Sequence, residues 1–156
     1  MSSGHERELV LQFYQYFDQR RVEQALAMLA PEFVAHMAGL PAPLDKTGFT
    51  DFGLAFYNAF THGQHRFVEI VVQADRVVTC GTFSARHTGT FQGLPATGRD
   101  IEIAVMHIDR VKDGTIVEHW GQGDAQGLMQ QLGILFFPGP GLLVDAIKQQ
   151  MGGGSR

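Results

Sequence analysis

The sequence has one cysteine, no cluster of basic residues and no long apolar run. Because Cys80 has no partner in the chain, an intrachain disulfide is excluded. Sixteen Asp and Glu residues outnumber twelve Lys and Arg residues, and the net charge of -4 argues against nucleic acid as a partner. No apolar stretch is long enough to span a bilayer, and the N-terminus lacks the apolar segment of a signal peptide. We therefore expect a cytoplasmic protein that does not insert into membranes.

The composition is typical of one globular domain. The chain has 156 residues, of which 44% are hydrophobic and 18% are charged. A chain of this length and composition can bury a substantial core. We expect a single domain over residues 1–151 and interpret residues 152–156 (Gly-Gly-Gly-Ser-Arg) as a flexible tail or a cloning scar.

The first 63 residues carry the apolar spacing of helices. Apolar residues recur every three to four positions over residues 9–17 and 22–29, and Pro31 favours an end to the second helix. Asp45 or Thr47 can cap a third helix, which Gly63 would end. We predict that four phenylalanines of this third helix face inward: Phe49, Phe52, Phe56 and Phe60.

After Gly63 the pattern changes to strands. We predict strands over 66–73, 76–91, 101–111 and 115–124, a short helix over 125–132 and a last helix over 142–151. The loops between the last strands are too short for parallel crossovers. Helices followed by an antiparallel meander indicate an α+β fold. A curved sheet wrapped around the N-terminal helices would form a cone with an interior pocket.

The second half of the chain resembles the SnoaL-like polyketide cyclases. The resemblance implies the cystatin-like cone that ketosteroid isomerase and scytalone dehydratase share, and a cyclase, isomerase or lyase without cofactor or metal. It places His107 at the active-site histidine position and Gly121 where the family has its acid/base aspartate. The residues that carry it are FQGLPATG from Phe91, MHIDR from Met106, VKDGTIVEHW from Val111, Asp124 and QQLG from Gln130.

The register of the last hairpin decides which side chains share the pocket. A three-residue loop with Gly114 as a G1 bulge would pair His107 with His119 and Val105 with Gly121. Odd-numbered residues of both strands would then face the pocket. A two-residue turn would instead pair His107 with Trp120. We favour the first register because it brings the histidine and the aspartate positions of the family together.

Three carboxylates near His107 could take the place of the missing aspartate: Asp109, Glu118 and Asp124. Asp109 shares the face of His107, whereas Asp124 would need a bulge at the preceding glycines to swing inward. We predict His107, His119 and Asp124 as catalytic residues. The predicted substrate-binding residues are His36, Phe52, Phe56, His87, Val105, Asp109 and Gly121.

We predict a SnoaL-like enzyme that abstracts a proton next to a carbonyl group of a small apolar compound. The alternative is a protein of the same fold that binds a small molecule or a partner without chemistry, which Gly121 favours because glycine cannot act as a base. A zinc site built from the histidines is a third reading, but the sequence lacks a short-spaced ligand pair, so we expect no metal. Trp120 and Ile116, on the face opposite His107, suggest a homodimer through the outer side of the sheet.

Overall fold

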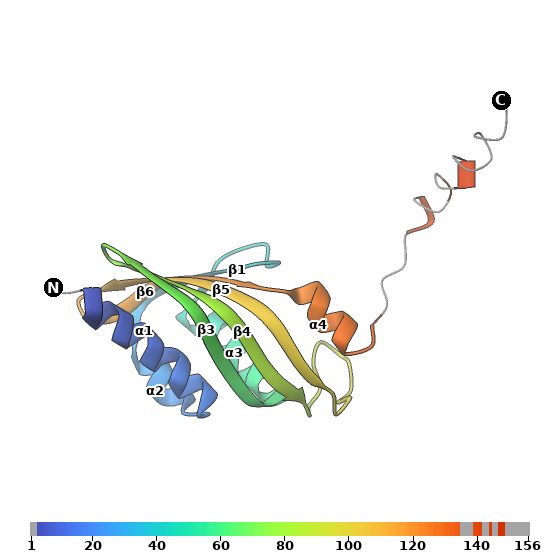
Figure 1. The fold of residues 1–156 in the computed structure, drawn as a ribbon, viewed down its shortest axis with the longest axis horizontal. Coiled ribbons are helices and arrows are strands. Elements are labelled where there is room, and N and C mark those ends of the chain that lie inside the picture. The colour runs from blue at the N-terminus through green and yellow to red at the C-terminus, as the bar shows by residue number, and fades with distance from the viewer. Residues whose placement is uncertain (1–2, 135–138, 142–143, 145–146, 149–156) are drawn as a thin grey trace.

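The computed structural model describes residues 3–134, 139–141, 144 and 147–148. Four helices and six strands follow one another over residues 3–131 (Figure 1). The helices are α1 (Ser3–Asp18), α2 (Val22–Ala27), α3 (Lys46–Ala59) and α4 (Ala125–Gln131). The strands are β1 (Leu29–Met37), β2 (Leu44–Asp45), β3 (Phe60–Gln73), β4 (Arg76–His87), β5 (Asp100–Lys112) and β6 (Thr115–Gly123).

The six strands form one curved sheet that arches over α1, α2 and α3 (Figure 1). The strand order is β2-β1-β6-β5-β4-β3. The α+β cone is confirmed, but the sheet is mixed rather than wholly antiparallel, because β1 runs parallel to β6. The chain can make this pairing because α3 and the β3–β4–β5 meander separate the two strands in sequence.

Local sequence explains where α3 begins and which side of it is buried. The Asp45 carboxylate caps the helix by accepting a hydrogen bond from the Gly48 amide at 2.8 Å. Phe49 is buried, whereas Phe52 is 37% exposed, so the prediction that Phe52 faces inward is wrong. Gly53 takes the inward position instead, where Phe17 packs 3.6 Å from the point at which a Cβ would lie.

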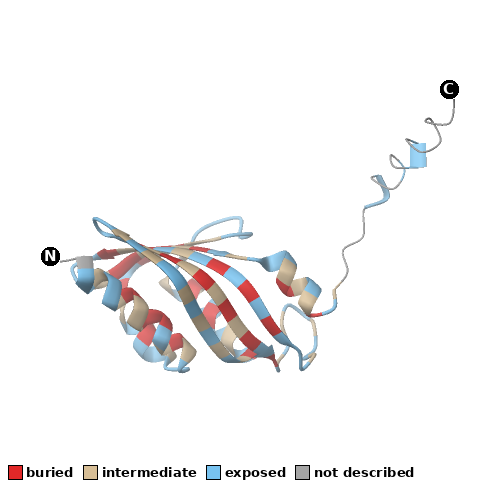
Figure 2. Cartoon of the chain, in the orientation of Figure 1, coloured by how far each residue is buried: buried red, intermediate tan, exposed pale blue. Residues whose placement is uncertain are grey.

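The core lies between the helices and the concave face of the sheet. Buried and exposed residues alternate along β4 and β5, as expected for strands with one covered face (Figure 2). One cluster packs α1, α2 and α3 against the sheet, and its largest members include Phe13, Phe17 and Phe33. A second cluster around Phe60 and Phe83 fills the end near α4. The predicted last helix over 142–151 is described only in part, and residues 152–156 lie outside the described residues.

The β5–β6 hairpin differs from both predicted registers. Asp113 and Gly114 have φ values of +49° and +76° and form a two-residue turn that pairs Lys112 with Thr115. The register then shifts by one residue, because Val111 pairs with Ile116 and Arg110 pairs with Glu118.

The shift brings His107 opposite Gly121 and Val105 opposite Gly123. The predicted pairs of His107 with His119, and of Val105 with Gly121, are therefore wrong. The prediction that odd-numbered residues of both strands share the inner face is confirmed for Asp109, His119 and Gly121, which are all buried there. The prediction that Ile116 lies on the outer face is wrong, because Ile116 precedes the register shift and is fully buried in the core.

Candidate active site

A chain of hydrogen bonds links buried side chains from α1, β5 and β6. The Tyr14 hydroxyl donates to Asp109 Oδ2 at 2.7 Å, and His119 Nδ1 lies 2.7 Å from Asp109 Oδ1. Asp109 is fully buried, and His119 is 3% exposed. Because a carboxylate only accepts hydrogen bonds, Nδ1 of His119 donates to Asp109, and Nε2 lies on the other edge of the ring.

Tyr14 holds the Asp109 carboxylate from the helix side. Burial raises the pKa of Tyr14 well above its usual value of 10.0, and the charge of Asp109 together with the hydrogen bond raises it further. The hydroxyl therefore stays protonated through the neutral range and remains a donor. With both oxygens occupied by hydrogen bonds, the carboxylate keeps one orientation toward His119.

His107 lies beside this chain with no hydrogen bond of its own. Its ring centroid is 4.9 Å from that of Tyr14 and 5.4 Å from that of His119. Both ring nitrogens are buried and have no partner within the described part of the chain. Burial lowers the pKa of His107 well below 6.5, and the neighbouring His119 and His65 lower it further. The ring is therefore neutral, with one nitrogen able to donate and the other able to accept a hydrogen bond.

Gly121 lies directly against Nε2 of His119, so a side chain at this position would have to displace a neighbour. A Cβ at position 121 would lie 2.8 Å from His119 Nε2 and 2.9 Å from Met37 Cε. Met37, which pairs with Gly121 across β1 and β6, therefore fills the position of a side chain at residue 121, together with the edge of the His119 ring. Methionine adapts its shape readily, so a bound molecule could displace it.

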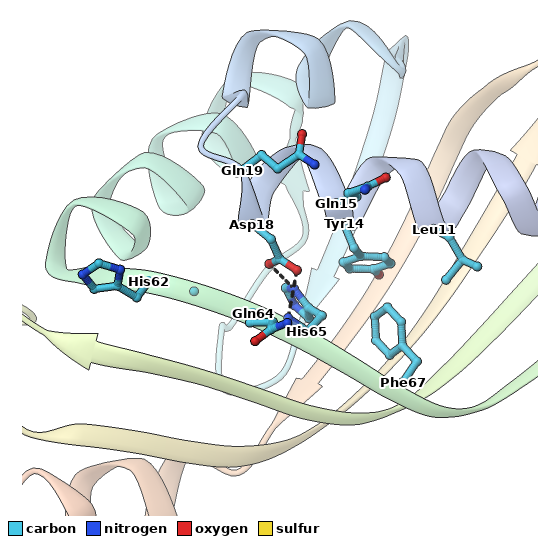
Figure 3. A pocket seen from close by; sticks show the side chains of 10 residues that line it. Leu11, Tyr14, Gln15, Asp18, Gln19, His62, Gln64, His65 and Phe67 are labelled. Atoms are coloured by element: carbon cyan, nitrogen blue, oxygen red, sulfur yellow. Dashed lines mark hydrogen bonds and ion pairs between the residues drawn. The ribbon is translucent and has the colours of Figure 1, made fainter.

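A groove of about 560 Å³ opens between α1 and β3 and borders this cluster. Tyr14, Asp18, His65 and Phe67 contribute to its lining (Figure 3). Asp18 Oδ1 lies 2.7 Å from His65 Nδ1, and Asp18 Oδ2 accepts a hydrogen bond from the His65 amide at 2.8 Å. The site thus contains a second pair of an aspartate and a histidine, and the ring of His65 lies 5.9 Å from that of His107.

Across the residues that the structure describes, no group of three or more His, Cys, Asp or Glu is arranged to hold a metal ion. The described helices include none that is long and apolar enough to cross a membrane.

Comparison with known proteins identifies the family of this chain. A sequence profile of the SnoaL-like polyketide cyclases matches residues 8–132, which is most of the chain. The chain belongs to the SnoaL-like polyketide cyclase family. The match includes most of α1, the β5–β6 hairpin and the three residues of the hydrogen-bonded chain between them.

Individual proteins and solved structures are also similar to this chain. IdmH from Streptomyces antibioticus, a candidate polyketide cyclase, is 29% identical with a TM-score of 0.72, over 83% of this chain and 99% of IdmH. AclR from Streptomyces galilaeus, a candidate hydroxylase, has the same fold, with 23% identity and a TM-score of 0.80 over 86% of this chain and 100% of AclR. The aklanonic acid methyl ester cyclase DnrD from Streptomyces peucetius is 42% identical over 48 residues, which are 31% of this chain and 33% of DnrD.

Two predicted site residues of this SnoaL-like chain lie outside the polar cluster. Asp124 is exposed and caps α4 by accepting a hydrogen bond from the Gly127 amide at 2.8 Å, so the prediction that it swings inward is wrong. A carboxylate one turn before a helix amide is an effective N-cap, and this contact holds it at the surface. The prediction that His36 lines the pocket is also wrong, because its even position on β1 puts it on the outer face of the sheet, beside Glu118 and Trp120.

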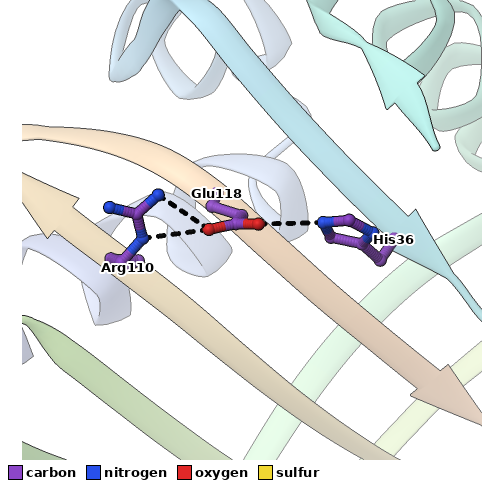
Figure 4. A network of polar contacts seen from close by, with 3 residues as sticks. All are labelled: His36, Arg110 and Glu118. Carbon is purple, nitrogen blue, oxygen red and sulfur yellow. Dashed lines mark hydrogen bonds and ion pairs between the residues drawn. The ribbon is translucent and has the colours of Figure 1, made fainter.

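The outer face carries its own polar network (Figure 4). Glu118 lies between Arg110, at 2.7 Å, and His36 Nε2, at 2.9 Å. Partial burial opposes ionisation of Glu118, but the hydrogen bonds and charges of His36 and Arg110 lower its pKa overall. The ring of His36 also stacks on Trp120 at 4.9 Å.

The remaining predicted pocket residues lie mainly in the second core cluster. His87 is fully buried at the end of β4, where its ring stacks on Phe60 and Nδ1 accepts a hydrogen bond from the Thr97 amide. Phe56 and Val105 pack in the same cluster. Of the predicted site residues, the structure brings together His107, His119, Asp109 and Gly121.

The sequence prediction missed Tyr14, Asp18 and His65. Tyr14 and Asp18 are four residues apart on α1 and therefore share one helix face with buried Val10. The position of Asp18 on this apolar helix face is the feature of the sequence that predicts a buried polar partner for its carboxylate. His65 has no comparable signal, because its pairing depends on how β3 crosses α1.

Proposed function

We propose that the chain is a cofactor-free enzyme of the cyclase type that removes a proton next to a carbonyl group of a small apolar compound. His119 is the base, and Asp109 and Tyr14 hold it in place. His107 donates a hydrogen bond to the enolate oxygen that develops as the proton leaves. The carbonyl compound approaches through the groove between α1 and β3.

One observation carries this proposal: the contact between position 121 and His119. The resemblance to the family predicts an acid/base aspartate at this position, and glycine cannot move a proton. His119 Nε2 lies 2.8 Å from the point where that side chain would begin. We infer that the acid/base group has moved from residue 121 to the neighbouring histidine of the same strand.

The surroundings of His119 support a role as base. A buried aspartate on Nδ1 fixes the tautomer with a free Nε2 and stabilises the imidazolium that forms when Nε2 takes a proton. The neutral His107 ring, 5.4 Å away, can supply an N–H to a developing oxyanion without adding a positive charge that would compete for the proton. Apolar neighbours such as Phe49, Phe67 and Met37 exclude water from this corner of the core.

The test uses aklanonic acid methyl ester, the compound in the names of the cyclases that share 48 residues with this chain. We expect the wild-type chain to convert it to a cyclised product of the same mass. The variants His119→Gln and Asp109→Asn should lower kcat by about 100-fold or more, the usual contribution of general base catalysis. Binding of the ester without turnover would favour the non-catalytic alternative.

A further inference from the structure

We propose that Asp18 and His65 form a second acid/base pair, which delivers a proton from His65 Nε2 to the oxygen of a second carbonyl group in the substrate. The proposal rests on the function proposed above and assigns the acid for a ring closure between two carbonyl groups of one substrate. The first group would supply the carbon nucleophile near His119, and the second would accept it near the groove.

Two contacts fix the orientation of the His65 ring. Asp18 binds both Nδ1, at 2.7 Å, and the backbone amide of the same residue, at 2.8 Å. Because Nδ1 faces the carboxylate, Nε2 lies on the opposite edge of the ring. The side chain of His65 is 9% exposed and that of Asp18 is 17% exposed, so the pair is largely shielded but reaches the groove.

The arrangement repeats that of the pair proposed as the base. In both pairs an aspartate oxygen lies 2.7 Å from Nδ1 of a histidine on the sheet. His107 neighbours both rings, at 5.9 Å from His65 and 5.4 Å from His119. A substrate that touches His107 can therefore reach both pairs.

An aldol ring closure needs both a base and an acid. His119 Nε2 takes the proton from the carbon next to the first carbonyl group, and the resulting enolate carbon attacks the second carbonyl carbon. A carbon–carbon bond forms, the second C=O π bond breaks, and its oxygen takes a proton from Nε2 of doubly protonated His65. The Asp18 carboxylate provides the counter-charge for that ring. The proton left on His119 returns to His65 through solvent, so the net reaction moves one proton from carbon to oxygen.

The test separates the two proton transfers with aklanonic acid methyl ester in D2O. Deuterium uptake next to the carbonyl group reports the first transfer, and ring closure reports both. We expect His65→Gln to retain deuterium uptake within a few-fold of the wild type and to lose ring closure by 100-fold or more. His119→Gln should lose both. His5→Gln, an exposed histidine near the start of α1, is the matched control and should lose neither.

A structural role for His65 would give a different pattern. A joint loss of uptake and closure in His65→Gln, or no loss of either, would overturn the proposal. Asp18→Asn, which keeps the side-chain shape, should show the same selective loss and serves if His65→Gln does not fold. A wild-type chain that takes up no deuterium would instead contradict the proposed function, so the two failures are distinguishable.

Discussion

At the scale of single residues, the Tyr14 hydroxyl links α1 to the proposed base, because it binds the Asp109 carboxylate that holds His119. It is the only side chain in the described structure that donates to Asp109 Oδ2, and this donation leaves Oδ1 for His119. The buried carboxylate thus has both oxygens satisfied, as a charge in a core requires.

Tyr14→Phe should therefore weaken both the fold and the reaction. Removing the donor leaves a buried carboxylate oxygen without a partner, which costs about 2–3 kcal/mol of unfolding free energy. The ring stays in place, so the loss reports the hydrogen bond. Tyr16→Phe on the same helix is the matched control and should unfold like the wild type. Urea unfolding measures both, and equal stability of the two variants would show that the Tyr14 hydrogen bond contributes nothing.

His107 should make stability depend on pH. Its pKa in the folded chain lies below 6.5, whereas in the unfolded chain it returns to about that value. Between these two values the unfolded chain binds a proton that the folded chain does not, so stability falls as the pH drops below 6.5. We expect a wild-type slope steeper than that of His107→Gln by up to about 1.4 kcal/mol per pH unit. Parallel unfolding curves of the two proteins between pH 7.5 and 5.5 would contradict this.

The residue types in the sequence predict some residues of the site but not the hydrogen bonds between them. His107, His119 and Asp109 are recognisable because they alternate along strands and therefore share a face. Asp124 looked equally suitable in sequence, yet its amide partner is three residues away and keeps it at the surface. Local capping competes with any long-range role, and the sequence pattern alone does not rank the two.

At the scale of elements, one turn and one bulge decide the site. The two-residue turn alone would have placed His119 on the outer face. The shift after Ile116 restores the inner face for His119 and Gly121. Bulges depend on packing between strands rather than on a local motif, which explains why the face was predicted correctly and the pairing was not.

The close packing of β6 against β1 around Gly121 predicts the effect of adding a side chain at this position. In Gly121→Ala, the new Cβ would lie 2.8 Å from His119 Nε2 and 2.9 Å from Met37 Cε, so one of them must move. We expect a loss of about 1–3 kcal/mol in stability, as for other overpacked cores, and a lower kcat. Adding Met37→Ala should recover part of the stability but not the activity, because His119 stays displaced. Full activity in Gly121→Ala would show that this space is not used in the reaction.

At the scale of the molecule, the outer face of the sheet exposes large apolar side chains to solvent. Met106 is 56% exposed and Ile108 is 36% exposed, and with Trp120 they border a hollow of about 400 Å³. We predict that a second copy of the chain covers this face in a symmetric dimer. Met106→Glu should dissociate it in sedimentation experiments, whereas Leu54→Glu on α3 should not. A wild-type monomer at micromolar concentration would contradict the prediction.

The overall architecture was predictable from the order of elements. Helical spacing before Gly63 and strand-like residues after it lead to an α+β cone, and the short loops of the meander determine its antiparallel part. The parallel pairing of β1 with β6 was not predictable in this way, because it joins segments about 85 residues apart through contacts that form only when the sheet closes.

The central claim is that His119, and not His107, removes the proton. The most direct measurement is the rate of deuterium uptake next to the carbonyl group of aklanonic acid methyl ester, compared between His119→Gln and His107→Gln. We predict a loss of about 100-fold or more in His119→Gln, because the base is gone. The loss in His107→Gln should be less than about tenfold, since the glutamine amide can still donate to the enolate oxygen. A small loss in His119→Gln beside a large loss in His107→Gln would contradict the account.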